Sequence, residues 1–257
     1  MSTRALKHTK KQQAELLSTW AGIGNEGLDN GLTRERIVAA AVALADKNGL
    51  AAVSIRKVAS QLEASAMALY HYVPSKRDLL NLMLDETYRE FEVPTNNVVD
   101  WRALLHHFAW ESRRCLQRHP WISVLRANDP EYGPRCIETL EALLTGLARF
   151  GLDIRTAIRL LGALFVFVNG FVAAEGIDAD RSGPKGKQRR TTQQPVFSKA
   201  VLANGNFPNV ARFIEMGAEL PDDQAFERAL NWMLAGIAAD IPPQARSLTR
   251  AKVNRIG

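Results

Sequence analysis

Four side chains with metal-binding chemistry recur at intervals of four residues in one stretch of the sequence: His107, Glu111, Cys115 and His119. If this stretch is helical, each step of four residues rotates the face by about 40°, so at most two neighbours can chelate one ion well. Cys115 and His119 are the best such pair for a tetrahedral ion, and its other ligands would have to come from elsewhere. Ordinary core or surface roles for the histidines are the competing interpretation. We expect no metal site and no cofactor.

A second chemical pattern is the run Gly22-Ile23-Gly24-Asn25-Glu26-Gly27, which matches the dinucleotide-binding fingerprint letter for letter. That fingerprint needs a strand before it and a helix opening at it. Here the helix-like run QQAELLSTW precedes it and the loop LDNGL follows, so we reject a nucleotide site. The sequence also lacks a nucleophile elbow, a phosphate-binding loop and an H-E-x-x-H pattern. It gives no positive support for an enzyme.

The stretch 54–73, SIRKVASQLEASAMALYHYV, suits contact with DNA. The hydroxyl of Ser54 can cap one short helix, and that of Ser65 can cap a second helix that ends near Tyr72. Glu63 lies in the break between them. This arrangement is a helix-turn-helix, whose second helix enters a DNA groove.

The second of these helices divides into an inward face and outward faces. Leu69 and Val73 are four residues apart and point inward. Small residues at the start of the helix allow close approach to base edges, and its tyrosine and histidine tips can reach phosphates. The residues left for the outward faces are Ala66, Met67, Ala68, Tyr70, His71 and Tyr72.

The segment ALYHYVPSKRDLL, residues 68–80, resembles the DNA-binding domain of the tetracycline-repressor (TetR) family, and the resemblance extends over 32–91. It rests on the aromatic end of the second helix, the link through Pro74 and the Ser75-Lys76 start of the next helix. The family usually has glycine where this sequence has Glu63. The resemblance therefore implies a left-handed residue there, at a cost of about 1 kcal/mol.

By motif position, the resemblance implies that Arg56 and the stretch Ala66 to Ala68 contact base edges. The phosphate contacts would include the N-terminus of the first helix, at Thr33, and the start of the fourth, at Lys76. The full predicted set is Thr33, Ser54, Ile55, Arg56, Ser65, Ala66, Met67, Ala68, Tyr70, His71, Tyr72 and Lys76. Three alternatives stay open: Ser54 and Ser65 can act as caps only, and Tyr72 can pack against the fourth helix.

Residues 95–243 predict a second, larger helical region. Its order of HPWISVL, GP and an apolar helix ending in GFVAAE resembles, more loosely, the ligand-binding and dimerisation half of the same family. The resemblance implies a pocket for a small-molecule effector, although core packing is the alternative for each aromatic residue. The candidate pocket residues are Trp101, His106, Phe108, Trp121, Phe165 and Asn169.

The run from Leu160 to Ala174 is apolar apart from Asn169. At about fifteen residues it is shorter than the roughly 20 needed to span a bilayer. We expect no membrane contact and a helix over 153–175 buried by its own domain and by a second subunit. With a final helix over 222–239 it would form a four-helix bundle across the two-fold axis of a homodimer.

The composition agrees with a soluble protein of 257 residues and 28.5 kDa, 46% hydrophobic and 23% charged. The net charge of +6 and the pI near 9.5 favour a polyanionic partner without proving one. Two cysteines provide no disulfide framework, and the polar N-terminus has no export signal, so we expect a cytoplasmic protein. Residues 1–31 predict a flexible basic arm, 177–195 a disordered charged loop and 244–257 a basic tail.

Together these features predict an all-α protein with a three-helix DNA-binding domain and a larger helical ligand-binding and dimerisation domain. The predicted function is a transcriptional repressor that a small apolar or amphipathic ligand releases from a near-palindromic operator in double-stranded DNA. An activator, or a regulator that needs no ligand, is the first alternative. A metal-dependent sensor or helical enzyme that uses the 107–119 face is the second.

Overall fold

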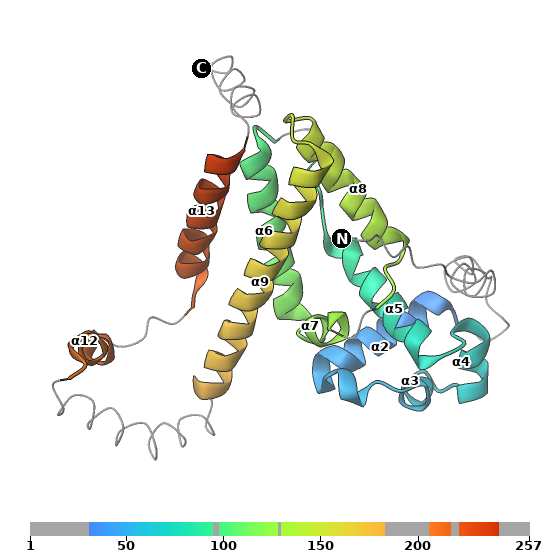
Figure 1. Ribbon diagram of the computed structural model, residues 1–257. Helices are drawn as coiled ribbons and strands as arrows, with labels where there is room; N and C mark the ends of the chain where they lie inside the picture. Colours follow the sequence, from blue (N-terminus) through green and yellow to red (C-terminus); the bar gives the residue numbers. More distant parts are fainter. Residues whose placement is uncertain (1–30, 95–97, 128–129, 183–205, 217–220, 242–257) are drawn as a thin grey trace, which may run out of the picture. The chain divides into compact units, whose positions relative to one another are not determined.

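The computed structural model describes residues 31–94, 98–127, 130–182, 206–216 and 221–241, and every regular element within these residues is a helix (Figure 1). The all-α prediction is therefore confirmed. The chain divides into two compact units: one holds Met1–Val98 and Trp110–Leu147, and the other Val99–Ala109 and Ala148–Gly257. Residues 1–30, the basic run from 183 to 190 and the tail 244–257 lie outside the described residues.

The first unit begins with α2 (Arg34–Asn48), η1 (Leu50–Ala52), α3 (Ile55–Gln61) and α4 (Ala66–Tyr72). Helix α2 packs against α3, and α3 packs against α4. Gly49 ends α2 with φ 77°, a left-handed conformation that glycine adopts without steric cost. The apolar residues on the inner faces of these helices form a small core that fixes the helix-turn-helix.

The fourth helix is α5 (Lys76–Thr87), which the 3₁₀ turn η2 (Tyr88–Glu90) extends. Ser75 caps it, because the Ser75 hydroxyl accepts a hydrogen bond from the backbone N–H of Asp78 at 3.1 Å. The helix packs along α2 and buries polar as well as apolar residues. The buried polar residues are Asn81, Asp85 and Thr87.

Three further helices follow: α6 (Trp101–Arg118), α7 (Trp121–Arg126) and α8 (Pro134–Ala148). The second half of α6, together with α7 and α8, belongs to the same compact unit as the DNA-binding helices. This division differs from the predicted domain boundary near residue 95. The reason is the set of polar and apolar contacts that α5 and η2 make with these three helices.

The second unit contains the start of α6 together with α9 (Ile154–Ser182), α12 (Pro208–Met216) and α13 (Asp223–Asp240). Phe226 of α13 lies between two aromatic rings of α9, with centroid distances of 5.4 Å to Phe167 and 5.0 Å to Phe171. These contacts and neighbouring leucines form the core of the unit. Helix α9 continues to Ser182, so the prediction of a loop from residue 177 is wrong; no helix-breaking residue occurs there before Gly183-Pro184.

One described helix, over Ile154–Gly176, is long and apolar enough to cross a membrane by length and composition, with a mean hydropathy of 2.0. Its 23 residues exceed the fifteen estimated from the sequence, so the argument from length does not hold. Only 28% of its most apolar window is buried within the single chain. Most of that window is therefore exposed in the single chain.

Candidate nucleic-acid interface

The helix-turn-helix has the local geometry that its sequence predicts. Ser54 accepts a hydrogen bond from the backbone N–H of Lys57 at 3.3 Å, and Ser65 accepts one from that of Ala68 at 3.1 Å. Both predicted caps are confirmed. Glu63 has φ 55°, the left-handed conformation that its position in the turn implied. The strain of about 1 kcal/mol is the cost of a side chain where glycine would fit.

Helix α4 presents a distinct outer face. Leu69 and Val73 are fully buried, whereas the exposed fractions of Met67 and Tyr70 are 71% and 47%. His71 is also exposed, and Ala66 and Ala68 are half-buried. The first turns of α4 thus offer a small-residue surface that a DNA groove can approach closely.

The remaining predicted DNA contacts differ in exposure. Arg56 and Lys76 are exposed, at positions where long cationic side chains can reach a polyanion. Ile55 and Tyr72, by contrast, are only 5% and 6% exposed. Their burial favours packing over DNA contact, and for Tyr72 this is the alternative drawn from the sequence. Thr33 is half-buried and caps α2, with its hydroxyl accepting from the backbone N–H of Arg36 at 3.2 Å.

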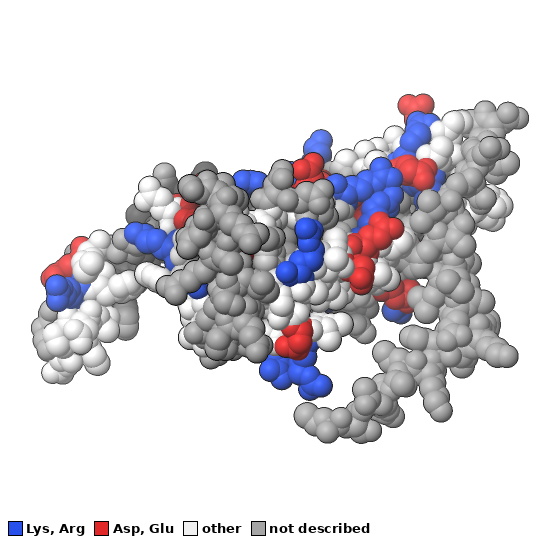
Figure 2. Space-filling view, turned by 90° about the horizontal axis from the view of Figure 1, so that it is seen from above, with Lys and Arg blue, Asp and Glu red and all other residues white. Residues whose placement is uncertain are grey.

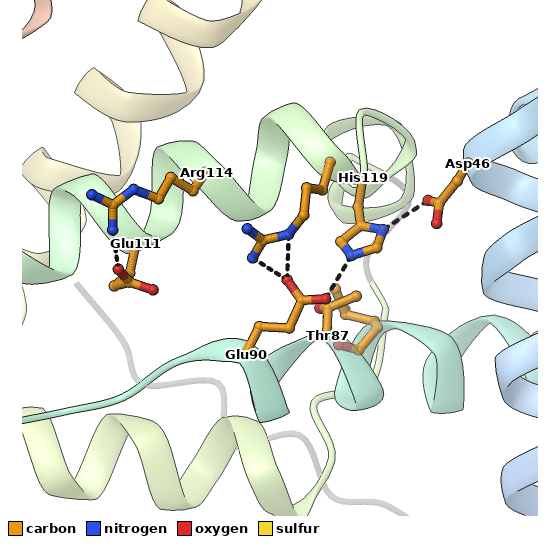
Figure 3. Close-up of polar contacts among 8 residues, drawn as sticks. Asp46, Thr87, Glu90, Glu111, Arg114 and His119 are labelled. Carbon is orange, nitrogen blue, oxygen red and sulfur yellow. Dashed lines mark hydrogen bonds and ion pairs between the residues drawn. The ribbon is translucent and has the colours of Figure 1, made fainter. Parts of the chain in front are cut away.

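A polar cluster joins the link between α6 and α7 to α2 and η2 (Figure 3). His119 is 6% exposed; its Nδ1 lies 2.7 Å from Asp46 Oδ1 and its Nε2 lies 2.9 Å from Glu90 Oε1. Trp121 Nε1 donates to the same oxygen of Asp46 at 2.6 Å, and Arg118 donates to Glu90. One histidine therefore connects the end of the first DNA-binding helix to the end of the α5–η2 segment.

The charge of Glu90 is stabilised within this cluster. Burial raises the pKa of the Glu90 carboxyl, but hydrogen bonds from His119 and Arg118 and their positive charge outweigh burial and lower it overall. Glu90 is thus held as a carboxylate, the form that can accept from both partners.

A second cluster joins α5 to the start of α8. The buried carboxylate of Asp85 accepts from the backbone N–H of Cys136 at 3.1 Å and from Arg135 at 3.3 Å. Asn81 accepts from the backbone N–H of Glu131 at 3.2 Å. Burial raises the pKa of Asp85, and the contacts with Cys136 and Arg135 oppose that shift. Asp85 therefore satisfies an N–H group that the first turn of α8 leaves without an intrahelical partner.

The side chains first considered for a metal take part in other interactions. Glu111 pairs with Arg114 on the surface of α6, and His119 belongs to the cluster described above (Figure 3). Cys115 is 2% exposed, and burial raises the pKa of its thiol to about 12, which disfavours the thiolate that binds metals. Among the residues that the structure describes, no group of three or more His, Cys, Asp or Glu side chains could hold an ion.

The predicted pocket residues belong to both units. Trp121 lies in the first unit, where it is bound to Asp46. In the second unit Trp101 is buried and Phe108 half-buried, whereas Phe165 is 43% exposed. His106 pairs with Glu227 of α13 at 2.9 Å, and the Asn169 amide donates to the Phe165 carbonyl oxygen at 2.8 Å. Whether any of them contacts an effector stays a prediction.

Charge is mixed on the face shown in Figure 2, where Lys and Arg side chains alternate with Asp and Glu side chains among the described residues. The described residues therefore form no uniform basic surface on that face.

Some of the connecting residues gave no signal in the sequence. Asp46 and Glu90 are two of many acidic residues on helical surfaces. Their contacts with the two ring nitrogens of His119 depend on tertiary packing. The only signal was the segment His119-Pro120-Trp121, which ends α6 and opens α7. It supplies both donors to Asp46.

Comparisons with known proteins agree with this architecture. Residues 37–83 match the family described as bacterial regulatory proteins, tetR family, and residues 93–241 match the tetracyclin repressor-like C-terminal domain. The chain is 35% identical over 216 residues to the HTH-type transcriptional repressor DrrR1 of Streptomyces coeruleorubidus, a match that covers 80% of this chain and 77% of the relative. It is 33% identical over 211 residues to an HTH-type transcriptional regulator of Saccharopolyspora erythraea, covering 81% and 85%.

Among solved structures, the TetR family protein ActR of Streptomyces coelicolor, in complex with (S)-DNPA, superposes with a TM-score of 0.65 and 26% identity. The match covers 82% of this chain and 99% of ActR. With both halves matched in order and the helix-turn-helix geometry in place, the chain belongs to the tetracycline-repressor family of DNA-binding transcriptional regulators.

Proposed function

We propose that the protein is a homodimeric repressor that a small apolar or amphipathic molecule releases from a near-palindromic operator. The observation that carries this proposal is the outer face of α4, where Met67 and Tyr70 are exposed beside small residues on a helix held by buried Leu69 and Val73. A two-fold dimer would place two such helices in successive major grooves, about 34–36 Å apart.

The DNA contacts divide by chemistry. Arg56 on α3 and the Ala66–Ala68 stretch on α4 are proposed to read base edges, since an arginine fork can bind guanine and small residues permit close approach. Tyr70, His71, Lys76 and the N-terminus of α2 at Thr33 are proposed to position the protein on phosphates. The exposure of Arg56, Tyr70, His71 and Lys76 supports this division.

The dimer would form through α9 and α13. The exposed residues of α13 include Trp232, 74% exposed, on one stripe with small residues at 235, 236 and 239. On α9, Val166 is 71% exposed, and Gly162 has nothing within 4 Å of where a Cβ would lie. Large exposed apolar side chains beside small residues suit close helix packing with a second copy. Burial in that interface would also account for the apolar exposed face of α9 without a membrane.

The effector is proposed by analogy with ActR, whose structures hold (S)-DNPA and actinorhodin. A ligand can release the operator only if it binds better to a dimer with wrongly spaced recognition helices than to the DNA-competent dimer. The Asp85 and Glu90 clusters connect α5 and η2 to α6, α7 and α8, and they are the contacts through which such a change would reach α2. The protein is proposed to be cytoplasmic and to have no catalytic activity.

Transcription from a promoter that carries the bound site tests the sign of regulation. Purified protein should lower transcript yield in a defined reaction with RNA polymerase, and actinorhodin, used as a probe ligand, should restore it. A rise in transcript on adding the protein would establish an activator instead. Repression that no tested ligand relieves would favour the regulator without a ligand.

A further inference from the structure

Arg34 lies at the first position of α2, next to the proposed phosphate contact Thr33, yet its side chain turns toward the recognition helix. Its Nε donates to the backbone carbonyl oxygen of Tyr72 at 3.1 Å, joining residues 38 positions apart. Arg34 is half-buried, whereas Arg36 in the same helical turn is exposed. The two arginines therefore have different surroundings although they are close in sequence.

The acceptor of this hydrogen bond lies at the C-terminal end of α4, because Tyr72 is the last residue of that helix. The last carbonyl groups of a helix have no intrahelical donor, and a cation near them also interacts favourably with the helix dipole. Helix α4 has only seven residues, so a contact at its end restrains the direction of the whole helix. The ring of Tyr72, which is 6% exposed, fixes the same end from the core side.

The surroundings of Arg34 act on its charge in opposite directions. Burial lowers the pKa of the Arg34 guanidinium, and the nearby carboxylates of Glu35 and Asp78 oppose that shift. A cavity of about 20 Å³ adjoins it, lined also by Asp85 of α5 and Arg135 of α8. The half-buried side chain thus has a protein acceptor, the Tyr72 carbonyl oxygen, that a purely solvent-directed arginine would lack.

We propose that Arg34 is a positioning residue for sequence readout, which fixes the C-terminal end of α4 to the N-terminal end of α2 and does not itself bind DNA phosphate. The phosphate anchor at Thr33 and the base-reading face of α4 then move as one rigid unit. This inference rests on the proposed function, since it needs α4 to read an operator.

The test compares Arg34→Lys and Arg34→Gln with the control Arg36→Gln, which removes the same charge two residues away in the same helical turn. Operator and random-sequence DNA are titrated with each full-length variant at several salt concentrations, after its unfolding transition has been checked. Lysine keeps the charge but lacks the planar, fixed Nε donor. Arg34→Lys should therefore lose about tenfold in operator affinity, the lower end for one hydrogen bond from a charged group. Its binding to random DNA and its salt slope should not change.

Full operator affinity in Arg34→Lys would overturn the proposal. So would an equal loss on both DNAs in Arg34→Gln with the salt slope reduced by about one, because that is the signature of a phosphate contact. If Arg34→Gln does not unfold cooperatively, Arg34→Lys alone decides. If the unaltered protein prefers no sequence, the proposed function itself is overturned. This outcome is distinct from failure of the Arg34 proposal, because it is seen without any variant.

Discussion

His119 and Asp46 lie 73 positions apart in the sequence, and their side chains are joined at 2.7 Å between Nδ1 and Oδ1. The other ring nitrogen of His119 faces Glu90 at 2.9 Å. Both ring nitrogens of His119 therefore face a carboxylate oxygen. This bridge connects α2, which carries the first DNA-binding positions, to the segment that leaves α5.

Replacing His119 with alanine should lower the free energy of unfolding by about 2 kcal/mol. Removal of one partner from a buried charged pair costs about 3–5 kcal/mol. The expected cost is smaller here because Asp46 and Glu90 are partly exposed and keep other donors, Trp121 and Arg118. Urea unfolding at fixed protein concentration measures the change. The control Glu111→Gln breaks the Glu111–Arg114 surface pair and should cost under about 0.5 kcal/mol. Equal effects of the two variants would contradict a structural role for the bridge.

The Glu90 contacts should make stability sensitive to acid. The folded protein holds the pKa of Glu90 below its ordinary value of 4.5, so its contribution is present above that pH and is lost as the pH falls through the lowered value. Glu90→Gln should be less stable than the unaltered protein at pH 7, and the difference should shrink between pH 5 and pH 3. A constant difference over that range would mean that the charge of Glu90 does not stabilise the fold.

Asp85 should act mainly through its hydrogen bond to the start of α8. Asp85→Asn keeps an oxygen that can accept from the Cys136 N–H and should cost less than about 1 kcal/mol. Asp85→Ala leaves that buried N–H group unsatisfied and should cost about 2 kcal/mol. Thermal unfolding of the two variants distinguishes these cases. Similar losses in both would assign the stabilisation to the ion pair with Arg135.

A bulky residue at Gly162 should block dimer formation without damaging the protomer. A Cβ at this position meets nothing within 4 Å in the single chain, so the side chain in Gly162→Leu begins in open space and would project into the proposed interface. Sedimentation of Gly162→Leu should show monomer at concentrations where the unaltered protein is a dimer. Glu141→Leu, which adds an exposed leucine on α8, should remain dimeric. A dimeric Gly162→Leu would remove this face from the proposed interface.

Arg56 and Lys76 should affect DNA binding in different ways. Arg56→Ala should cost about 1–3 kcal/mol on the operator and relax the preference at one base pair, whereas Lys76→Ala should weaken all sequences alike and reduce the salt slope by about one. Competition binding against single-base operator variants measures both effects. Equal losses of Arg56→Ala on operator and random DNA would remove its base-reading role.

The sequence predicted local features better than tertiary ones. The caps at Thr33, Ser54 and Ser65 and the left-handed Glu63 depend on residues within a few positions of each other, so local chemistry determined them. The end of α9 was misplaced because the charged stretch after Gly176 was interpreted as a loop, whereas the helix continues through Gly176 to Ser182.

Contacts between distant helices could not be predicted in the same way. Nothing local distinguishes Asp46 from Glu35, the other exposed acid on α2. The hydrogen bond from Trp121 to the Asp46 carboxylate was not predicted either. Tyr72 was equally ambiguous, since an aromatic residue at the end of a recognition helix suits both a phosphate and a core. Its burial depends on how α4 packs, which only the three-dimensional structure shows.

Selection of DNA fragments by the purified, full-length protein in moderate salt tests the central claim most directly. The account predicts one near-palindromic motif, with half-sites one helical turn apart, bound far more tightly than random fragments. Bound fragments that share no motif, with an affinity that falls steeply as salt is raised, would contradict it. That result would mean that the positive charge of the chain, and not α3 and α4, accounts for binding.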